Sequence, residues 1–145
     1  MKYFAQSIFA ILLAVTASFA NETDVNDNAL ILKGGEINLD DFLWINRPIV
    51  VLADSPGDPR FVEQMRLLRE QLPDLKDRDV VVITDTEPSQ KTDLRQKLRP
   101  RGFMLVLIGK DGGIKLRKPS PWNVREISRI IDKMPMRRQE MRAGG

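Results

Sequence analysis

The sequence predicts a single α/β domain, in which flanking helices cover a central sheet and the elements follow the order β-α-β-α-β-β-α. Three continuous apolar runs rich in β-branched residues, at 48–53, 79–84 and 103–108, are typical of strands covered on both faces. An apolar stripe at helical spacing lies between the first two runs, at 61–72. The Asp-Gly pair within 110–113 predicts a tight hairpin after the third run.

Shorter elements precede the first long strand. Residues 29–32 predict a short edge strand, and residues 39–44 predict one or two helical turns capped by Asn38 or Asp40. The chain has two tryptophans, Trp44 at the end of this segment and Trp122 in the second half of the chain, and both are expected in the core.

The first long helix has clear start and stop signals. Asp58 suits the N-cap and Pro59 the first helical position, while Pro73 is expected to end the helix. Because a strand, a helix and a second strand follow one another, we expect a right-handed parallel βαβ unit.

The second half continues this pattern. A weaker helix is expected at 89–98, and the alternation of apolar and charged residues at 114–117 is typical of an edge strand. Ser120-Pro121 is expected to begin the last helix. Four residues form the apolar stripe of that helix: Ile127, Ile130, Ile131 and Met134.

The N-terminus has the pattern of a cleaved signal peptide. A lysine precedes an apolar run, and small residues at 18 and 20 suit a signal peptidase, so we expect cleavage after Ala20. The alternative is an uncleaved anchor, although the run is short for a membrane span. We therefore expect an exported protein, periplasmic or secreted, with a leader at 21–35, a domain at 36–134 and a basic tail at 135–145.

Composition limits the chemistry. The 145-residue chain has no cysteine and no histidine. Cleavage would remove Lys2 from the 23 basic residues, leaving 22 against 20 acidic ones, a net charge of +2. The absence of these two residue types excludes thiol chemistry, disulfides, imidazole catalysis and Cys/His metal sites. We also expect no cofactor.

Four stretches carry a resemblance to a known family: R-P-I-V-V-L-A-D-S-P-G-D-P-R, R-D-V-V-V-I-T-D, G-F-M-L-V-L-I-G-K-D-G-G-I-K-L-R and I-D-K-M-P-M-R-R-Q-E-M. Over roughly 39–142 the chain resembles the domain of unknown function family numbered 4174. That resemblance implies a thioredoxin-like, peroxiredoxin-related fold and relatives among secreted vertebrate proteins, but no established catalytic residues. It places Pro56 and Pro59 at about the positions of the two thioredoxin cysteines.

The turn after the first long strand is the first candidate site. Its candidate binding residues are Asp54, Ser55, Gly57, Asp58 and Arg60. The start of a helix offers free backbone N–H groups to an anion, and Arg60 could add a charged fork. The alternative is a rigid, well-capped turn without a ligand, with Asp58 itself in the N-cap.

Acidic residues form the second candidate site. Asp54 and Asp85 follow neighbouring parallel strands, with Glu87 close by, so they are expected at one edge of the sheet. Carboxylate oxygens could hold a divalent cation there, although the spacing matches no metal-loop motif. The alternative is that these residues only cap loops and helices.

Basic residues form the third candidate site. This basic edge comprises Arg99, Arg101, Lys115, Arg117, Arg137 and Arg138. If these side chains share one face, they could attract a polyanion or a membrane surface. Aromatic residues do not alternate with them, which argues against nucleic-acid binding. The alternative is a charged edge that discourages aggregation.

The favoured interpretation is a non-redox binding module whose partner is a protein or a small anionic ligand in the envelope or outside the cell. One alternative is an enzyme that uses the carboxylates, with or without a metal. The other is a polyanion or membrane-surface binder.

Overall fold

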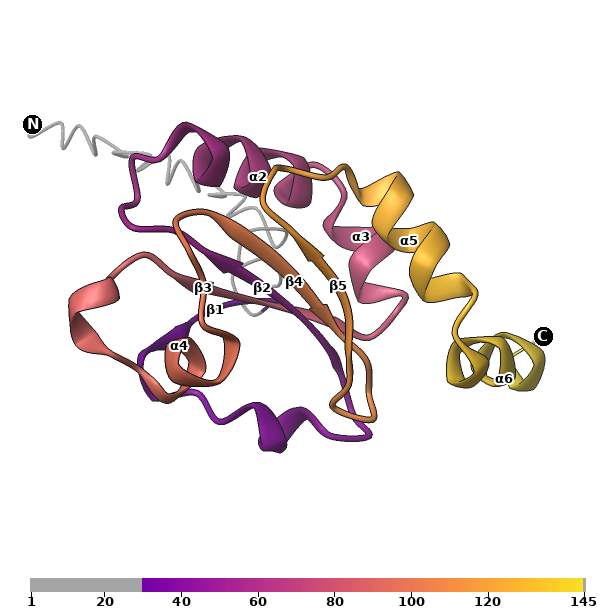
Figure 1. The fold of residues 1–145 in the computed structure, drawn as a ribbon. Coiled ribbons are helices and arrows are strands. Elements are labelled where there is room, and N and C mark those ends of the chain that lie inside the picture. The colour runs from indigo at the N-terminus through magenta and orange to yellow at the C-terminus, as the bar shows by residue number, and fades with distance from the viewer. Residues whose placement is uncertain (1–29, 145) are drawn as a thin grey trace, which may run out of the picture.

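The computed structural model describes residues 30–144, and the predicted signal peptide at 1–20 lies outside them. Its five-stranded sheet has the strand order β1-β3-β2-β4-β5 (Figure 1). The strands are β1 (Ile31–Lys33), β2 (Arg47–Leu52), β3 (Val80–Asp85), β4 (Met104–Ile108) and β5 (Ile114–Lys118).

Strand direction defines two edges of this sheet. β1 and β2 both run parallel to β3, whereas β4 is antiparallel to β2 and β5 is antiparallel to β4. The carboxyl ends of β1, β2, β3 and β5 therefore lie at the same edge as the start of β4. We call this the carboxyl edge.

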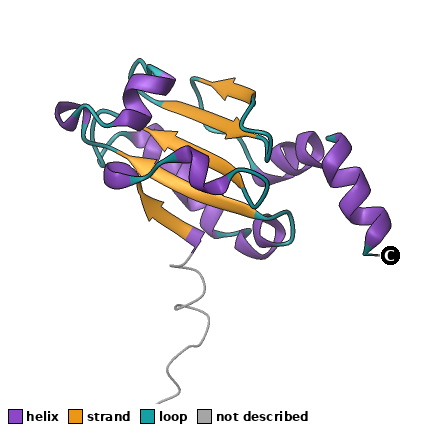
Figure 2. Cartoon of the chain, turned by 90° about the horizontal axis from the view of Figure 1, so that it is seen from below, coloured by secondary structure: helices purple, strands orange, loops and turns teal. Residues whose placement is uncertain are grey.

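Helices cover both faces of the sheet (Figures 1 and 2). One face packs against α2 (Pro59–Arg69), α3 (Leu72–Lys76) and α5 (Val124–Asp132), and the other against α4 (Asp93–Leu98) and the 3-10 turn η2 (Leu39–Phe42). Two apolar clusters fill these layers, so the long strands are buried on both sides as their composition predicted. In the described part of the chain, no helix is long and apolar enough to span a membrane.

The predicted start signals are confirmed. The Asp58 side chain accepts a hydrogen bond from the backbone N–H of Arg60 at 2.9 Å, and Pro59 is the first residue of α2. Asn38, rather than Asp40, caps η2, with 3.0 Å to the backbone nitrogen of Asp40. Gly112 adopts φ +81° in the β4–β5 hairpin, a conformation that glycine favours.

Three local predictions are wrong. Pro73 does not end α2, which stops at Arg69; it lies instead in the first turn of α3, where proline is tolerated. The last sheet-covering helix begins at Val124 behind an Asn123 cap rather than at 120–121. Trp44 is 65% exposed and has φ +65°, so it is not a core residue.

Two other segments differ in detail from their predicted forms. The weak helix at 89–98 is divided into the 3-10 turn η3 (Pro88–Gln90) and α4. A further 3-10 turn, η1 (Gly34–Glu36), follows β1, and β1 itself falls within the 21–35 span expected as a leader.

The basic tail forms a helix that is attached to the domain by ion pairs. α6 (Pro135–Ala143) carries Glu140, whose carboxylate lies 3.0 Å from the guanidinium of Arg47 and 2.7 Å from Nζ of Lys110. Arg47 is only 1% exposed, although it begins a strand. The tail therefore docks at the edge of the sheet opposite the carboxyl edge.

Candidate binding site at the carboxyl edge

The turn between β2 and α2 is held rigidly at the carboxyl edge. Asp54, Ser55 and Gly57 are exposed, and the Ser55 carbonyl accepts a hydrogen bond from the Asp58 N–H at 3.3 Å. Behind them, the Ala53 N–H donates to the Asp85 carbonyl at 3.0 Å. The turn thus presents its polar residues to solvent on a fixed backbone.

Asp58 and Arg60 are partners of each other. Arg60 donates from Nε and Nη2 to the two Asp58 carboxylate oxygens, at 3.2 and 3.0 Å, in addition to its backbone bond. These hydrogen bonds from Arg60 lower the pKa of Asp58. The Arg60 guanidinium also lies over the Phe103 ring, 5.7 Å from the centroid, and therefore extends along the carboxyl edge. Asp58 is a cap and an ion-pair partner, and it is not a free carboxylate.

Asp85 does not contribute an open carboxylate to an acidic edge. It is 6% exposed, and its Oδ1 accepts from Nε of Arg95 at 2.8 Å while its Oδ2 accepts from the Thr92 hydroxyl at 2.9 Å. Asp54 remains exposed, and the Glu87 carboxylate accepts a hydrogen bond from the side-chain amide of Gln90. Within residues 30–144, no three Asp, Glu, His or Cys side chains are grouped so that they could hold a metal ion.

Arg95 is the residue of this edge that the sequence did not reveal. Its Nη2 donates to the carbonyls of Ala53 at 2.6 Å and Asp85 at 3.0 Å, so it joins α4 to the ends of β2 and β3. In the sequence it lies among other basic residues, with no local sign that it is buried.

A cavity of about 650 Å³ opens beside the turn, between the ends of β1 and β3 and the face of α2 that carries Phe61, Met65 and Arg69. Its apolar lining comes from Ile31, Pro56, Phe61 and Met65. Lys33, Arg69, Glu87 and Gln90 supply charged and polar groups to the same cavity. Of the acidic residues predicted from sequence, Asp85 and Glu87 line this cavity, and Pro56 brings the turn to its rim. The five candidate residues of the turn lie beside the cavity and do not line it; they are Asp54, Ser55, Gly57, Asp58 and Arg60.

The predicted basic edge is divided between the two ends of the sheet. Near the carboxyl edge, Arg117 donates to the Leu98 carbonyl and lies 3.1 Å from the Met104 sulfur, which brings it close to the exposed Arg99 and Arg101.

The other basic residues lie away from this group. At the hairpin end, Lys115 pairs with Asp111 at 3.0 Å. Arg137 on α6 is 9% exposed and pairs with Asp77 and Asp132, so it adds nothing to an exposed basic surface, whereas its neighbour Arg138 is exposed.

Comparison with known proteins identifies the fold. A 2-Cys peroxiredoxin of Plasmodium vivax matches with a TM-score of 0.55 and 14% identity, over 72% of this chain and 85% of the other. Thioredoxin peroxidase I of Plasmodium yoelii matches with a TM-score of 0.51 and 15% identity, over 71% and 80%. At these identities the likeness concerns the fold alone, which is thioredoxin-like.

Sequence relatives extend the comparison. A 46-residue part of the chain, 31% of its length, is 46% identical to coiled-coil domain-containing protein 80 of Danio rerio. The match spans 5% of that much longer relative. A family model matches residues 38–140, most of the chain. The chain therefore belongs to the family described as "Domain of unknown function (DUF4174)".

Proposed function

We propose that this chain is a non-redox binding module that acts after export, in the periplasm or outside the cell, and that its carboxyl edge holds an acidic polypeptide segment. The observation that carries the proposal is the cavity of about 650 Å³ beside the 54–60 turn. Its size falls within the range of about 300–1,000 Å³ that is usual for ligand sites.

The lining of the cavity favours a polypeptide. Four apolar residues, Ile31, Pro56, Phe61 and Met65, can surround one apolar side chain of a partner. Thr84, Thr86 and Gln90 offer hydroxyl and amide groups for the hydrogen bonds of a partner's backbone.

The charges favour an acidic partner. Among the described residues, exposed cations along the edge outnumber the exposed carboxylates by six to four. The cations are Lys33, Arg60, Arg69, Arg99, Arg101 and Arg117, and the carboxylates are Glu36, Asp54, Glu87 and Asp93. Complementary charge steers association and fixes register more than it adds raw affinity.

A thiol mechanism is unavailable to this chain, because it contains no cysteine. Pro56 and Pro59 fall at about the positions that the thioredoxin resemblance assigns to cysteines, and Pro59 is the first residue of α2. A fixed, proline-bounded turn suits recognition, which needs a preorganised surface.

Site-directed photo-crosslinking tests the proposal. A photoreactive residue replaces Arg60 in the chain expressed in its own cells, and adducts are identified by mass spectrometry. Lys76, exposed at the end of α3 and away from the carboxyl edge, is the matched control position. We expect one dominant protein adduct at Arg60 that is absent at Lys76.

A charge variant distinguishes recognition of an acidic partner from non-specific binding. We expect Arg60→Gln combined with Arg101→Gln to weaken capture of that same protein, and added salt to weaken it in the unmodified chain. The control variant is Lys76→Gln combined with Arg138→Gln, which removes the same charge elsewhere. Equal adducts at Arg60 and Lys76, or equal capture by both double variants, would overturn the proposal.

A further inference from the structure

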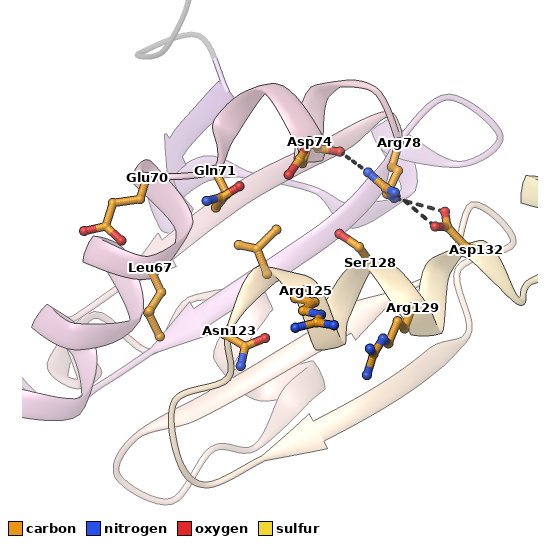
Figure 3. Close-up of a pocket in the computed structure, with 11 residues that line it drawn as sticks. Leu67, Glu70, Gln71, Asp74, Arg78, Asn123, Arg125, Ser128, Arg129 and Asp132 are labelled. Atoms are coloured by element: carbon orange, nitrogen blue, oxygen red, sulfur yellow. Dashed lines mark hydrogen bonds and ion pairs between the residues drawn. The ribbon is translucent and has the colours of Figure 1, made fainter.

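A second cavity, separate from the carboxyl-edge site, lies in the groove between α5 and the α2–α3 pair (Figure 3). Its volume is about 560 Å³. Arg78 closes one end, where its Nε and Nη2 each lie 3.0 Å from an Asp132 carboxylate oxygen and its Nη1 donates to the Asp74 carbonyl. Leu67 and Val124 are its apolar residues.

Ser128 is the unusual residue of this groove. It is 9% exposed, it lines the cavity, and its buried hydroxyl has no hydrogen-bond partner among the described residues. Figure 3 shows the hydroxyl directed from α5 toward α3, on the groove side of the helix. Buried hydroxyls usually have a partner, because an unpaired one costs folding free energy.

Opposite charges line the two walls. The α2–α3 wall carries Glu70 and Asp74, and the α5 wall carries Arg125 and Arg129. Glu70 pairs with Arg66, and Arg129 pairs with Glu126. The Asp74 carboxylate and the Arg125 guanidinium form no ion pair within residues 30–144 and are therefore available to a ligand.

Polar amides complete the site. Gln71 follows α2, and Asn123 caps α5 by accepting from the Glu126 N–H at 2.9 Å, which leaves its side-chain NH₂ unengaged. The positive end of the α5 dipole lies at the same end of the groove as Arg125. An anionic group is thus favoured near the start of α5, and a cationic group is favoured beside Asp74.

We infer that this groove binds a short peptide through its free termini, with the carboxylate toward Arg125 and the ammonium toward Asp74. The Ser128 hydroxyl would hydrogen-bond a backbone group between the two ends. The length follows from α5: Arg125 and Asp132, near the two ends of the groove, are seven residues apart, about 10 Å at about 1.5 Å per residue, and an extended chain spans about 3.3–3.6 Å per residue. A di- or tripeptide therefore fits better than a single amino acid.

Titration with trialanine tests the inference, using ¹⁵N-labelled chain and NMR. N-acetylated trialanine and trialanine amide serve as matched probes that each lack one terminal charge. We expect trialanine to shift the amide signals of residues along the groove, and each blocked probe to bind at least about tenfold more weakly. That loss corresponds to one charge-assisted hydrogen bond.

Variants assign the contacts. Arg125→Gln and Asp74→Asn should each weaken trialanine binding about tenfold or more, and Ser128→Ala should weaken it without lowering the stability of the chain. Arg138→Gln and Asp41→Asn, at exposed positions outside the groove, are the controls.

The inference is overturned by any of three results. These are no signal shifts with millimolar trialanine, equal binding of the blocked probes, or unchanged binding by both the Arg125 and the Asp74 variants. None of these residues lines the carboxyl-edge cavity. A negative trialanine titration therefore leaves the proposed function standing, and a negative crosslinking experiment leaves this inference standing.

Discussion

Arg95 and Asp85 form an ion pair inside the protein, with 2.8 Å between Nε and Oδ1 and side chains that are 9% and 4% exposed. Both side chains also bond to other groups: Nη2 of Arg95 donates to the Ala53 carbonyl, and Oδ2 of Asp85 accepts from the Thr92 hydroxyl. A buried pair with these additional hydrogen bonds fixes the position of α4 against the ends of β2 and β3. The candidate site at the carboxyl edge depends on that position.

The first prediction concerns this pair. Arg95→Met should lower the free energy of unfolding by about 3–5 kcal/mol, because it leaves the Asp85 carboxylate buried without its partner. Urea unfolding followed by circular dichroism measures the change. Arg66→Met is the control: Arg66 bridges Glu63 and Glu70 on the surface of α2, and its loss should barely move the unfolding midpoint. Similar effects of the two variants would contradict the prediction.

The second prediction concerns acid stability. Burial opposes the ionisation of Glu140, but hydrogen bonds from Arg47 and Lys110 outweigh it and lower its pKa from 4.5 to about 2. A lowered carboxyl pKa stabilises the folded state above the unfolded value, and this stabilisation is lost as pH falls from about 4.5 toward 2. Glu140→Gln should therefore cost about 2–3 kcal/mol at neutral pH.

The pH dependence of the free energy of unfolding shows whether the ionised Glu140 carboxylate causes this stabilisation. The stability difference between the native chain and Glu140→Gln should shrink steadily below about pH 4.5. Gln139→Ala, at an exposed neighbour on α6, should show no such dependence. A constant difference from pH 7 to pH 3 would mean that ionisation of Glu140 does not attach α6 to the domain.

Much of the fold could be predicted because its signals are local. Three features each depend on a few adjacent residues: the succession of long strands and helices along the chain, the Asp58-Pro59 helix start and the Gly112 hairpin. Pro73 misled the prediction because proline is equally compatible with the end of one helix and the first turn of the next.

The candidate site was less predictable, because partners distant in sequence determine which of its charged side chains are exposed and which are ion-paired. Asp85 follows a strand in a way typical of ligand-binding edges, yet Arg95, ten residues later, buries its charge. Arg137 is basic in sequence and ion-paired in space, through Asp77, sixty residues earlier. Trp44 is apolar and exposed. Neither periodicity nor composition records such long-range pairings.

The third prediction tests the hairpin. Gly112 has φ +81°, and a Cβ at this position would lie 2.9 Å from a methyl group of Leu43. Gly112→Ala should therefore destabilise the fold by about 1–2 kcal/mol through backbone strain and crowding. Gly57→Ala is the matched control, because a Cβ there meets nothing within 4 Å. Thermal unfolding of both variants gives the comparison, and an equal change in Tm would contradict it.

The fourth prediction concerns export. If residues 1–20 direct secretion, the mature chain begins at Asn21, and mass spectrometry of the protein from its own cells should recover an N-terminal peptide starting there. Signal peptidase requires a small residue immediately before the cut, so Ala20→Phe should leave the chain unprocessed, whereas Phe19→Leu, one position earlier, should not. Recovery of an unprocessed native chain, or normal processing of Ala20→Phe at the same bond, would contradict the expected signal peptide. The proposed partner would then have to be sought inside the cell or at its membrane.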